Sequence, residues 1–258
     1  MRTFLGLVFM CISLMLVSCT FTPQTPQPSF APLSDKDLLA YFSFDETLEG
    51  ILKGSVVEAE VCGGKIVESG GNIVYEGGNI VYEVGKKGKA AVFDGKSGII
   101  LPQRIVEDYD YTILFWVNVG NFTDHTPTIF ADTNKGWISF FVPKPWWRGE
   151  GEPAIWSFSQ SQWSTYNVGS LISKNTWYHI AIVVDSGKPS VYVNGSPVEL
   201  ESIEGKPLPD IFTEASDCIV ALGVNRWDTP FNGLIDELFI FNRPLKPHEI
   251  KTIYYLSY

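Results

Sequence analysis

The sequence predicts an all-β fold in which two sheets pack face to face. Aromatic residues make up 14% of the chain, and 23 glycines and 16 prolines divide it into short apolar runs, a pattern typical of strands joined by turns. Residues 234–241 are apolar on both alternating faces, with Leu238 and Ile240 on one face and Phe239 and Phe241 on the other. Such a strand is covered on both sides, which places it inside a sandwich of two sheets.

The other elements follow from alternating apolar runs bounded by turn residues. We expect irregular structure in residues 56–84, where Gly-Gly-Asn-Ile-Val-Tyr-Glu occurs twice in tandem, at 70–76 and 77–83. Two short copies cannot form a solenoid, so they predict a lengthened loop or a glycine-broken hairpin. Pro247 suits the first turn of a helix over 247–256. Further strands are expected at 38–44, 88–95, 99–102, 111–119, 128–132, 137–142, 154–159, 177–185, 190–195 and 219–224.

The N-terminal residues have the pattern of an export signal. Met1-Arg2-Thr3 precede an apolar stretch, residues 4–17, that is short for a membrane span. The next residues, Leu16-Val17-Ser18-Cys19, resemble the lipobox of bacterial lipoproteins, which implies a signal peptide over 1–18 and lipidation of Cys19. The alternative is an ordinary signal peptide with a chance cysteine. We expect an extracytoplasmic lipoprotein anchored to a membrane of the bacterial cell envelope, with a Pro-rich tether over 19–36 and the domain over 37–258.

The charge balance disfavours some partners. The formal net charge is −10 at pH 7, so the surface is acidic. An acidic surface suits neither nucleic acid nor anionic lipid. The membrane contact is therefore assigned to the lipid anchor alone.

Four segments resemble the motifs of concanavalin A-like, laminin-G-like domains: Phe44-Asp-Glu-Thr47, Trp177-Tyr-His179, Tyr192-Val-Asn-Gly195 and residues 231–245, which contain Ile-Asp-Glu-Leu. The resemblance covers residues 38–255. It implies a two-sheet antiparallel jelly-roll sandwich with a short C-terminal helix. That fold carries both lectins and glycoside hydrolases, so the fold alone does not decide the function.

A glycoside hydrolase is the less favoured interpretation. Such enzymes need two carboxyl groups that face each other across the scissile bond. Here Asp236 and Glu237 are adjacent, and adjacent strand residues point to opposite faces, so we expect that they cannot cooperate. A Gly-x-Ser-x-Gly elbow is absent, and His125, His179 and His248 lack the spacing of metal ligands. His179 is expected to be a hydrogen-bonded core residue.

The resemblance also implies a structural calcium ion where the first and last strands meet, with Asp45 and Asp236 as ligands. The alternative is that Asp45 caps a turn and Asp236 accepts backbone hydrogen bonds. Cys62 and Cys218 are the two cysteines of the predicted domain. Export to an oxidising space permits a disulfide between them, and two buried thiols are the alternative.

Loop tryptophans are the candidates for ligand binding. Trp146, Trp147 and Arg148 lie in a loop bordered by prolines and glycines, and Trp227 lies in another polar loop. Flat aromatic faces beside polar groups suit sugar rings, so we expect a non-catalytic domain that binds a polysaccharide or other glycan. Two alternatives remain: the rings close the rim of the sandwich, or the same loops contact a protein in an envelope assembly.

Overall fold

The structure, a computed structural model, describes residues 31–69, 72–74, 77–102 and 105–257. The expected signal peptide, Cys19 and most of the tether lie outside the described residues. In the part of the chain that is described, no helix has the length and apolar character needed to cross a membrane. The duplicated segments at 70–76 and 77–83 are described in part.

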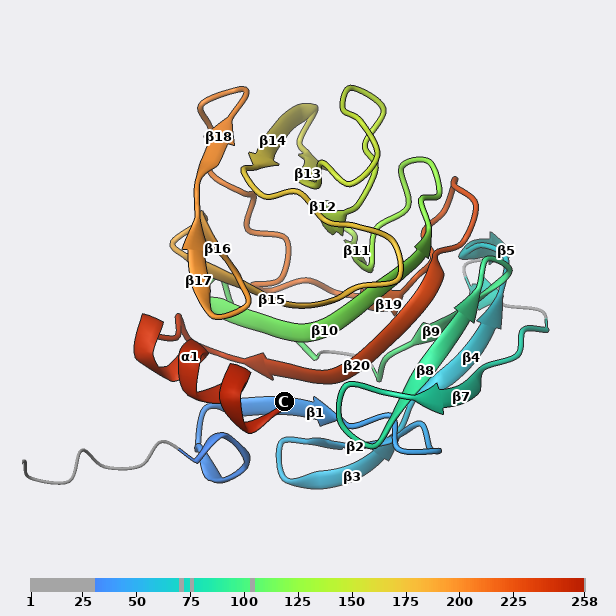
Figure 1. The fold of residues 1–258 in the computed structure, drawn as a ribbon. Coiled ribbons are helices and arrows are strands. Elements are labelled where there is room, and N and C mark those ends of the chain that lie inside the picture. The colour runs from blue at the N-terminus through green and yellow to red at the C-terminus, as the bar shows by residue number, and fades with distance from the viewer. Residues whose placement is uncertain (1–30, 70–71, 75–76, 103–104, 258) are drawn as a thin grey trace, which may run out of the picture.

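Two antiparallel sheets form the domain (Figure 1). Over the described residues, the larger sheet has ten strands, and its centre is built by β10 (Tyr111–Asn121) and β20 (Asn232–Phe241). One side continues from β10 through three strands, β15 (Trp177–Asp185), β16 (Lys188–Val193) and β17 (Ser196–Val198). On the other side, β20 pairs with β1 and β8, and the strands there are β1 (Leu38–Phe42), β2 (Glu49–Leu52), β3 (Ser55–Glu58), β7 (Val81–Val84) and β8 (Lys89–Asp94).

The second sheet has eight strands among the described residues. In spatial order they are β18 (Leu200–Ser202), β14 (Gln162–Val168), β13 (Ala154–Ser159), β12 (Gly136–Val142), β11 (Ile129–Thr133), β19 (Cys218–Leu222), β9 (Ser97–Ile100) and β4 (Glu60–Gly63). A separate hairpin pairs β5 (Val67–Ser69) with β6 (Asn72–Val74). The expectation of irregular structure over 56–84 is therefore wrong, because short strands of both sheets run through this region.

The main core lies between the two sheets. The larger sheet contributes Ile113, Phe115 and Val117 of β10, and the smaller sheet contributes Ile138 and Phe140 of β12. The opposite face of the larger sheet forms a second cluster beneath the helix α1 (Pro247–Leu256), with Leu114, Phe239, Phe241, Ile250 and Ile253 as members. The predicted two-sided burial of residues 234–241 is confirmed, and the second cover is a helix.

A β-bulge at Glu237 changes the alternation within β20. Leu114 pairs with Phe239 and Trp116 pairs with Asp236, so Glu237 and Leu238 together oppose one residue of β10. Glu237 has a φ of 48°, which is unusual for a residue with a side chain. The expectation that Asp236 and Glu237 point to opposite faces is therefore wrong: both carboxylates lie on the outer side, where Lys87 contacts each of them.

Trp116 anchors the C-terminal end of α1. Its indole Nε1 donates a 2.9 Å hydrogen bond to Oγ of Ser257, and its ring lies 5.3 Å from that of His179 and 5.6 Å from that of Tyr254. The expected hydrogen bond of His179 is not found, because both ring nitrogens are buried without a partner among the described residues. Burial lowers the pKa of His179 to about 3, so this core histidine is neutral.

Arg243 joins both ends of the domain. Its guanidinium pairs with Asp35 at 2.7 Å, with Asp37 at 3.1 Å and with Glu249 at 2.8 Å. Glu249 also accepts a 2.7 Å hydrogen bond from the backbone N–H of Lys246, the residue before α1. This bond caps the N-terminus of the helix, since the Lys246 side chain makes no capping hydrogen bond. Asp35 belongs to the segment that the sequence assigns to the tether, so the end of that segment lies against the folded domain.

Cys62 and Cys218 are buried thiols and are not joined by a disulfide. They lie in β4 and β19 of the smaller sheet, with β9 between them. Cys62 packs in a cluster on the outer face of that sheet, whereas Cys218 packs in the core between the sheets. The suggested disulfide is therefore excluded by position, because the two side chains are on opposite faces.

Candidate functional site

Six of the eight tryptophans gather over the outer face of the smaller sheet. We call this surface the aromatic face; its tryptophans are Trp137, Trp146, Trp147, Trp156, Trp163 and Trp227. Their rings form one connected set, with centroids 5.6 Å apart for Trp137 and Trp163, 5.3 Å for Trp137 and Trp227, and 4.9 Å for Trp147 and Trp156. An exposed aromatic patch of this kind is a candidate binding surface.

Strand alternation places three of these rings. Ile138 of β12 and Ile155 of β13 face the core, so their neighbours Trp137 and Trp156 face outward. Trp163 on β14 is paired with Phe158 of β13, which places it on the same face. None of these three positions is among the ligand-binding residues predicted from the sequence. Their signal was present in the alternation, but only the pairing of β12, β13 and β14 shows that they form one surface.

The loop between β12 and β13 carries the predicted Trp146 and Trp147. Trp146 is 72% exposed, whereas Trp147 is half-buried, and its Nε1 donates a 2.8 Å hydrogen bond to Oδ1 of Asn167. Arg148 donates its backbone N–H to the carbonyl of Pro145 within the loop. Its side chain lies 3.9 Å from Glu152 and does not line the hollow formed by the tryptophans.

Trp227 lies on a loop that its own polar residues hold in place. Oδ1 of the buried Asn225 accepts hydrogen bonds from the backbone N–H groups of Trp227 at 2.9 Å and Asp228 at 2.8 Å. The neighbouring Arg226 forms an ion pair with Asp132 of β11. Trp227 is 49% exposed and rests against Phe130, with ring centroids 5.9 Å apart. The loop thus holds an indole of which about half is exposed.

Two adjoining hollows lie on the aromatic face. The first, of about 410 Å³, is lined by Trp146, Trp147, Trp156, Trp163, Thr165, Ile203 and Glu204. The second, of about 370 Å³, is lined by His125, Trp137, Trp156, Phe158, Trp163, Trp227 and Asp228. Trp156 and Trp163 line both. Concave apolar walls with a few polar groups suit a ligand that has both apolar faces and hydroxyl groups.

The polar groups of these hollows are held by the protein. Glu204 accepts hydrogen bonds from the backbone N–H of Thr165 at 2.6 Å and from its hydroxyl at 3.0 Å. Asp228 accepts a 2.6 Å bond from the amide of Asn225 and lies 3.8 Å from Nδ1 of His125. These contacts fix where each carboxylate offers its remaining acceptor sites.

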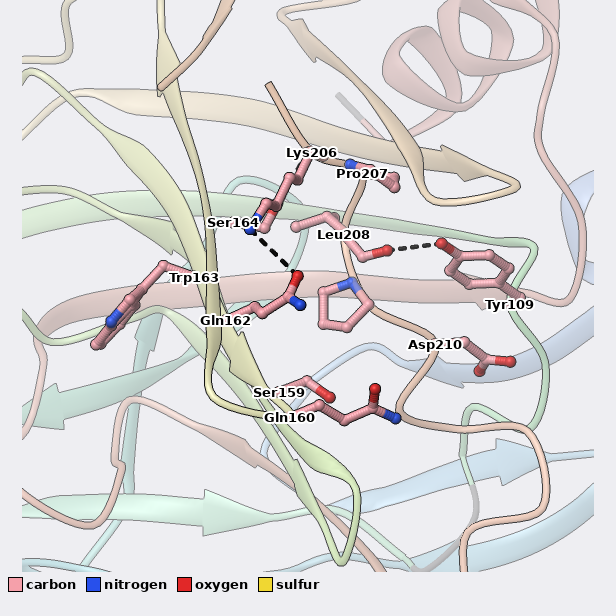
Figure 2. A pocket seen from close by; sticks show the side chains of 11 residues that line it. Tyr109, Ser159, Gln160, Gln162, Trp163, Ser164, Lys206, Pro207, Leu208 and Asp210 are labelled. Atoms are coloured by element: carbon pink, nitrogen blue, oxygen red, sulfur yellow. Dashed lines mark hydrogen bonds between the residues drawn. The ribbon is translucent and has the colours of Figure 1, made fainter. Parts of the chain in front are cut away.

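A third hollow, of about 410 Å³, lies on the other side of the β13–β14 hairpin. Figure 2 shows Gln162 on the side of Lys206 and Leu208, whereas the ring of Trp163, the next residue of β14, points away from them. The amide of Gln162 accepts a 3.2 Å hydrogen bond from Nζ of Lys206, and the hydroxyl of Tyr109 donates a 2.7 Å bond to the carbonyl of Leu208. Trp163 also borders this hollow, but the other five tryptophans of the aromatic face do not line it.

The predicted calcium ligands lie elsewhere, beside the β7–β8 turn. Oδ2 of Asp236 accepts hydrogen bonds from the backbone N–H groups of Lys86 at 2.8 Å and Lys87 at 3.0 Å. Oδ1 of Asp45 accepts a 2.7 Å bond from the backbone N–H of Lys89. The structure thus brings both predicted residues to one turn, in the backbone-accepting geometry that was the alternative to calcium.

Burial perturbs the carboxylates of this turn. Desolvation raises the pKa of Asp236 to about 7, against the backbone hydrogen bonds, which lower it. Desolvation also raises the pKa of Glu237, although Glu237 accepts hydrogen bonds from the hydroxyl of Tyr41 at 2.8 Å and from Nζ of Lys87 at 3.2 Å. Both carboxylates are buried.

Calcium fits this turn in one respect. Oδ1 of Asp236 is buried and has no hydrogen-bond partner among the described residues, which leaves an acceptor for a cation. Over the same residues, no cluster of three or more His, Cys, Asp or Glu side chains is arranged to hold a metal. A calcium ion at Asp236 would therefore draw most of its oxygens from backbone carbonyls and water.

The comparisons with known proteins agree with this fold. Residues 93–251 match the model described as the concanavalin A-like lectin/glucanases superfamily. Domain 4 of AbnA, a GH43 extracellular arabinanase from Geobacillus stearothermophilus, solved with arabinotriose, is 37% identical to this chain. The match covers 84% of this chain and 98% of that domain, with a TM-score of 0.70. Among curated proteins, no sequence matches.

More distant structures share the fold alone. The binding domain of botulinum neurotoxin DC, in complex with SialylT, is 13% identical, with a TM-score of 0.54 and coverage of 87% of this chain and 52% of that one. Trypanosoma rangeli sialidase with 2,3-difluorosialic acid is 15% identical, with a TM-score of 0.52 and coverage of 86% and 33%. The fold occurs in binding domains and in enzymes alike. By the matched model and the arabinanase domain, this chain belongs to the concanavalin A-like lectin/glucanases superfamily.

Proposed function

We propose that this chain is a carbohydrate-binding domain and that the aromatic face is its binding site. The observation that carries the proposal is the pair of tryptophan-walled hollows, in which fixed indoles surround a few fixed carboxylates. Sugar rings present apolar C–H faces that stack on indoles, and hydroxyl groups that such polar groups bind. The arabinanase domain, 37% identical, was solved with arabinotriose, so linear arabino-oligosaccharides are the first ligands to test.

We propose a binding function without catalysis. Glycoside hydrolysis needs two carboxyl groups across one bond, one of them able to donate a proton. Glu204 and Asp228 line separate hollows; Glu204 accepts hydrogen bonds from Thr165 of β14, and Asp228 accepts one from Asn225 of its own loop. The other close pair, Asp236 and Glu237, is buried beside the β7–β8 turn. This distribution supports binding over hydrolysis.

The test is retention on immobilised arabinan and on other neutral polysaccharides. Trp146→Ala should weaken retention at least tenfold with little change in melting temperature, because this ring is 72% exposed. Tyr255→Ala is the matched control, since Tyr255 is a 63% exposed aromatic residue on α1, away from the aromatic face. Equal retention of both variants and the parent would reject the aromatic face as the site. Retention by an envelope protein but by no polysaccharide would favour a protein-interaction module.

We also propose that Cys19 carries a lipid that anchors the domain outside the cytoplasm. The support is the sequence Leu16-Val17-Ser18-Cys19 and the proline-rich stretch that follows it. Cys19→Ala should move the protein from the detergent phase to the aqueous phase, or block its processing. Unchanged partitioning would reject the anchor.

A structural calcium ion at Asp236 and Asp45 is the remaining proposal. The unpartnered Oδ1 of Asp236 supports it. The ion would supply positive charge that stabilises a buried carboxylate and would tie the first strand to the β7–β8 turn.

A further inference from the structure

We infer that the aromatic face binds a linear, uncharged polysaccharide across at least two subsites. This inference rests on the proposed function and specifies its ligand. It starts from the relation between the two hollows, which share Trp156 and Trp163 as common walls. A ligand that fills one hollow therefore contacts two rings that also border the other hollow.

The sizes of the hollows argue for several sugar units. At about 410 and 370 Å³, each is at the lower end of the roughly 300–1,000 Å³ typical of small-molecule sites. Each hollow alone suits a short piece of a glycan, and the two together suit a longer one. Trp146 and Trp147 lie on the side of the first hollow, and Trp227 lies on the side of the second. Indole rings are therefore available for stacking on both sides of the shared walls.

The charges argue for an uncharged chain. Among the residues that line the two hollows, the ionisable side chains are Glu204, Asp228 and His125, with neither lysine nor arginine. The nearby Arg226 is already paired with Asp132. A uronate chain would place its carboxylates beside Glu204 and Asp228, and that repulsion would cost affinity. The net charge of −10 acts in the same direction.

The decisive experiment is calorimetric titration of the full chain, kept in mild detergent, with linear arabino-oligosaccharides of increasing length. If both hollows are used, affinity should rise at least tenfold from the disaccharide to the longest chains and then level off. Trp146→Ala should weaken binding of every length. Trp227→Ala should remove the gain in affinity of the longer chains and leave the disaccharide affinity within about twofold of the parent's. A tenfold change in affinity corresponds to about 1.4 kcal/mol of binding free energy.

Two controls keep the result interpretable. Trp227→Leu keeps apolar cover over Phe130 while removing the flat ring, so it separates loss of a platform from loss of folding. Gln162→Ala changes only the third hollow and should bind every length as the parent does. Oligogalacturonides of the same lengths should bind at least tenfold more weakly than the neutral series.

The outcomes separate the inference from the proposed function. Affinity that is independent of length but sensitive to Trp146→Ala would overturn the two-subsite arrangement and leave carbohydrate binding intact. Tighter binding of the oligogalacturonides, weakened by salt, would overturn the uncharged chain. A folded parent that binds none of the arabino-, cello- or xylo-oligosaccharides would overturn both the inference and the proposed function.

Discussion

The indole of Trp147 donates a 2.8 Å hydrogen bond to Oδ1 of Asn167, and this bond ties the loop between β12 and β13 to β14. Asn167 is itself held, because its amide donates a 2.9 Å bond to Oε2 of Glu201 on β18. The ring of Trp147 also lies 4.9 Å from that of Trp156. One wall of the first hollow is therefore in place before a ligand arrives, which lowers the ordering cost of binding.

Asn167→Ala should weaken glycan binding although Asn167 does not line either hollow. The substitution leaves Nε1 of Trp147 without its acceptor, which should cost about 1–2 kcal/mol of stability and release the ring. Affinity measured by titration should fall several-fold, and Trp fluorescence should report a more mobile indole. Glu201→Gln keeps a carbonyl acceptor for Asn167 and should behave as the parent does. An Asn167→Ala variant that binds normally would show that packing on Trp156 alone positions Trp147.

The sequence indicates the loop tryptophans of the site but not its full extent. Trp146, Trp147 and Trp227 stand out because turn residues keep their segments out of the sheets. Trp137, Trp156 and Trp163 lie on strands, where alternation alone allows either a core position or an outward one. Their assignment depends on which strands pair, and those pairings are long-range contacts that a single sequence does not specify. Arg148, predicted from its position beside the tryptophans, turns back toward Glu152 instead.

The strand pattern is predicted where it is regular and fails where the backbone departs from it. Residues 154–159, 177–185 and the helix at 247–256 have the predicted bounds. The Asp236–Glu237 prediction fails because a bulge reverses the alternation, and nothing in the local composition marks a glutamate for a φ of 48°. The short strands within 56–84 are missed because glycine-rich segments carry little periodicity.

The contact between Asp45 and the β7–β8 turn predicts that alanine substitutions at two glycines will cost different amounts of stability. Gly88 and Gly64 have similar positive φ values, 62° and 59°, so alanine should strain the backbone similarly at both positions. A Cβ at Gly88 would collide with Oδ1 of Asp45, whereas nothing lies within 4 Å of a Cβ at Gly64. Chemical denaturation should show a loss of about 1 kcal/mol for Gly64→Ala and clearly more for Gly88→Ala. Equal losses would mean that Asp45 is free to move off the turn.

The buried carboxylate of Asp236 predicts a specific pH dependence. Its pKa is about 7 in the folded chain against 3.8 in the unfolded one, so the folded state holds this proton more tightly. The protonated Asp236 carboxyl group therefore contributes stability that is fully present below about pH 4 and is lost as the pH rises through 7. In chelator-treated protein, Asp236→Asn should therefore gain stability relative to the parent between pH 4 and pH 7. The gain should be on the order of a few kcal/mol, at about 1.4 kcal/mol per unit of pKa difference. Urea denaturation measured at several pH values checks this expectation. A difference in unfolding free energy between the two proteins that stays constant from pH 4 to pH 7 would contradict it.

Calcium bound at Asp236 should offset the loss of stability that the parent shows as the pH rises toward 7. A cation beside Oδ1 excludes the proton, so calcium should stabilise the parent more at pH 7 than at pH 5. At a concentration about a hundredfold above its Kd, a ligand specific for the folded state adds about 2.7 kcal/mol, which melting curves resolve easily. Asp236→Asn and Asp45→Asn should lose most of this effect, while Glu201→Gln, far from the turn on β18, should retain it. Melting temperatures that are the same with calcium and with chelator at both pH values would show that this buried carboxylate is supported by hydrogen bonds, among them those from Lys86 and Lys87, and not by calcium.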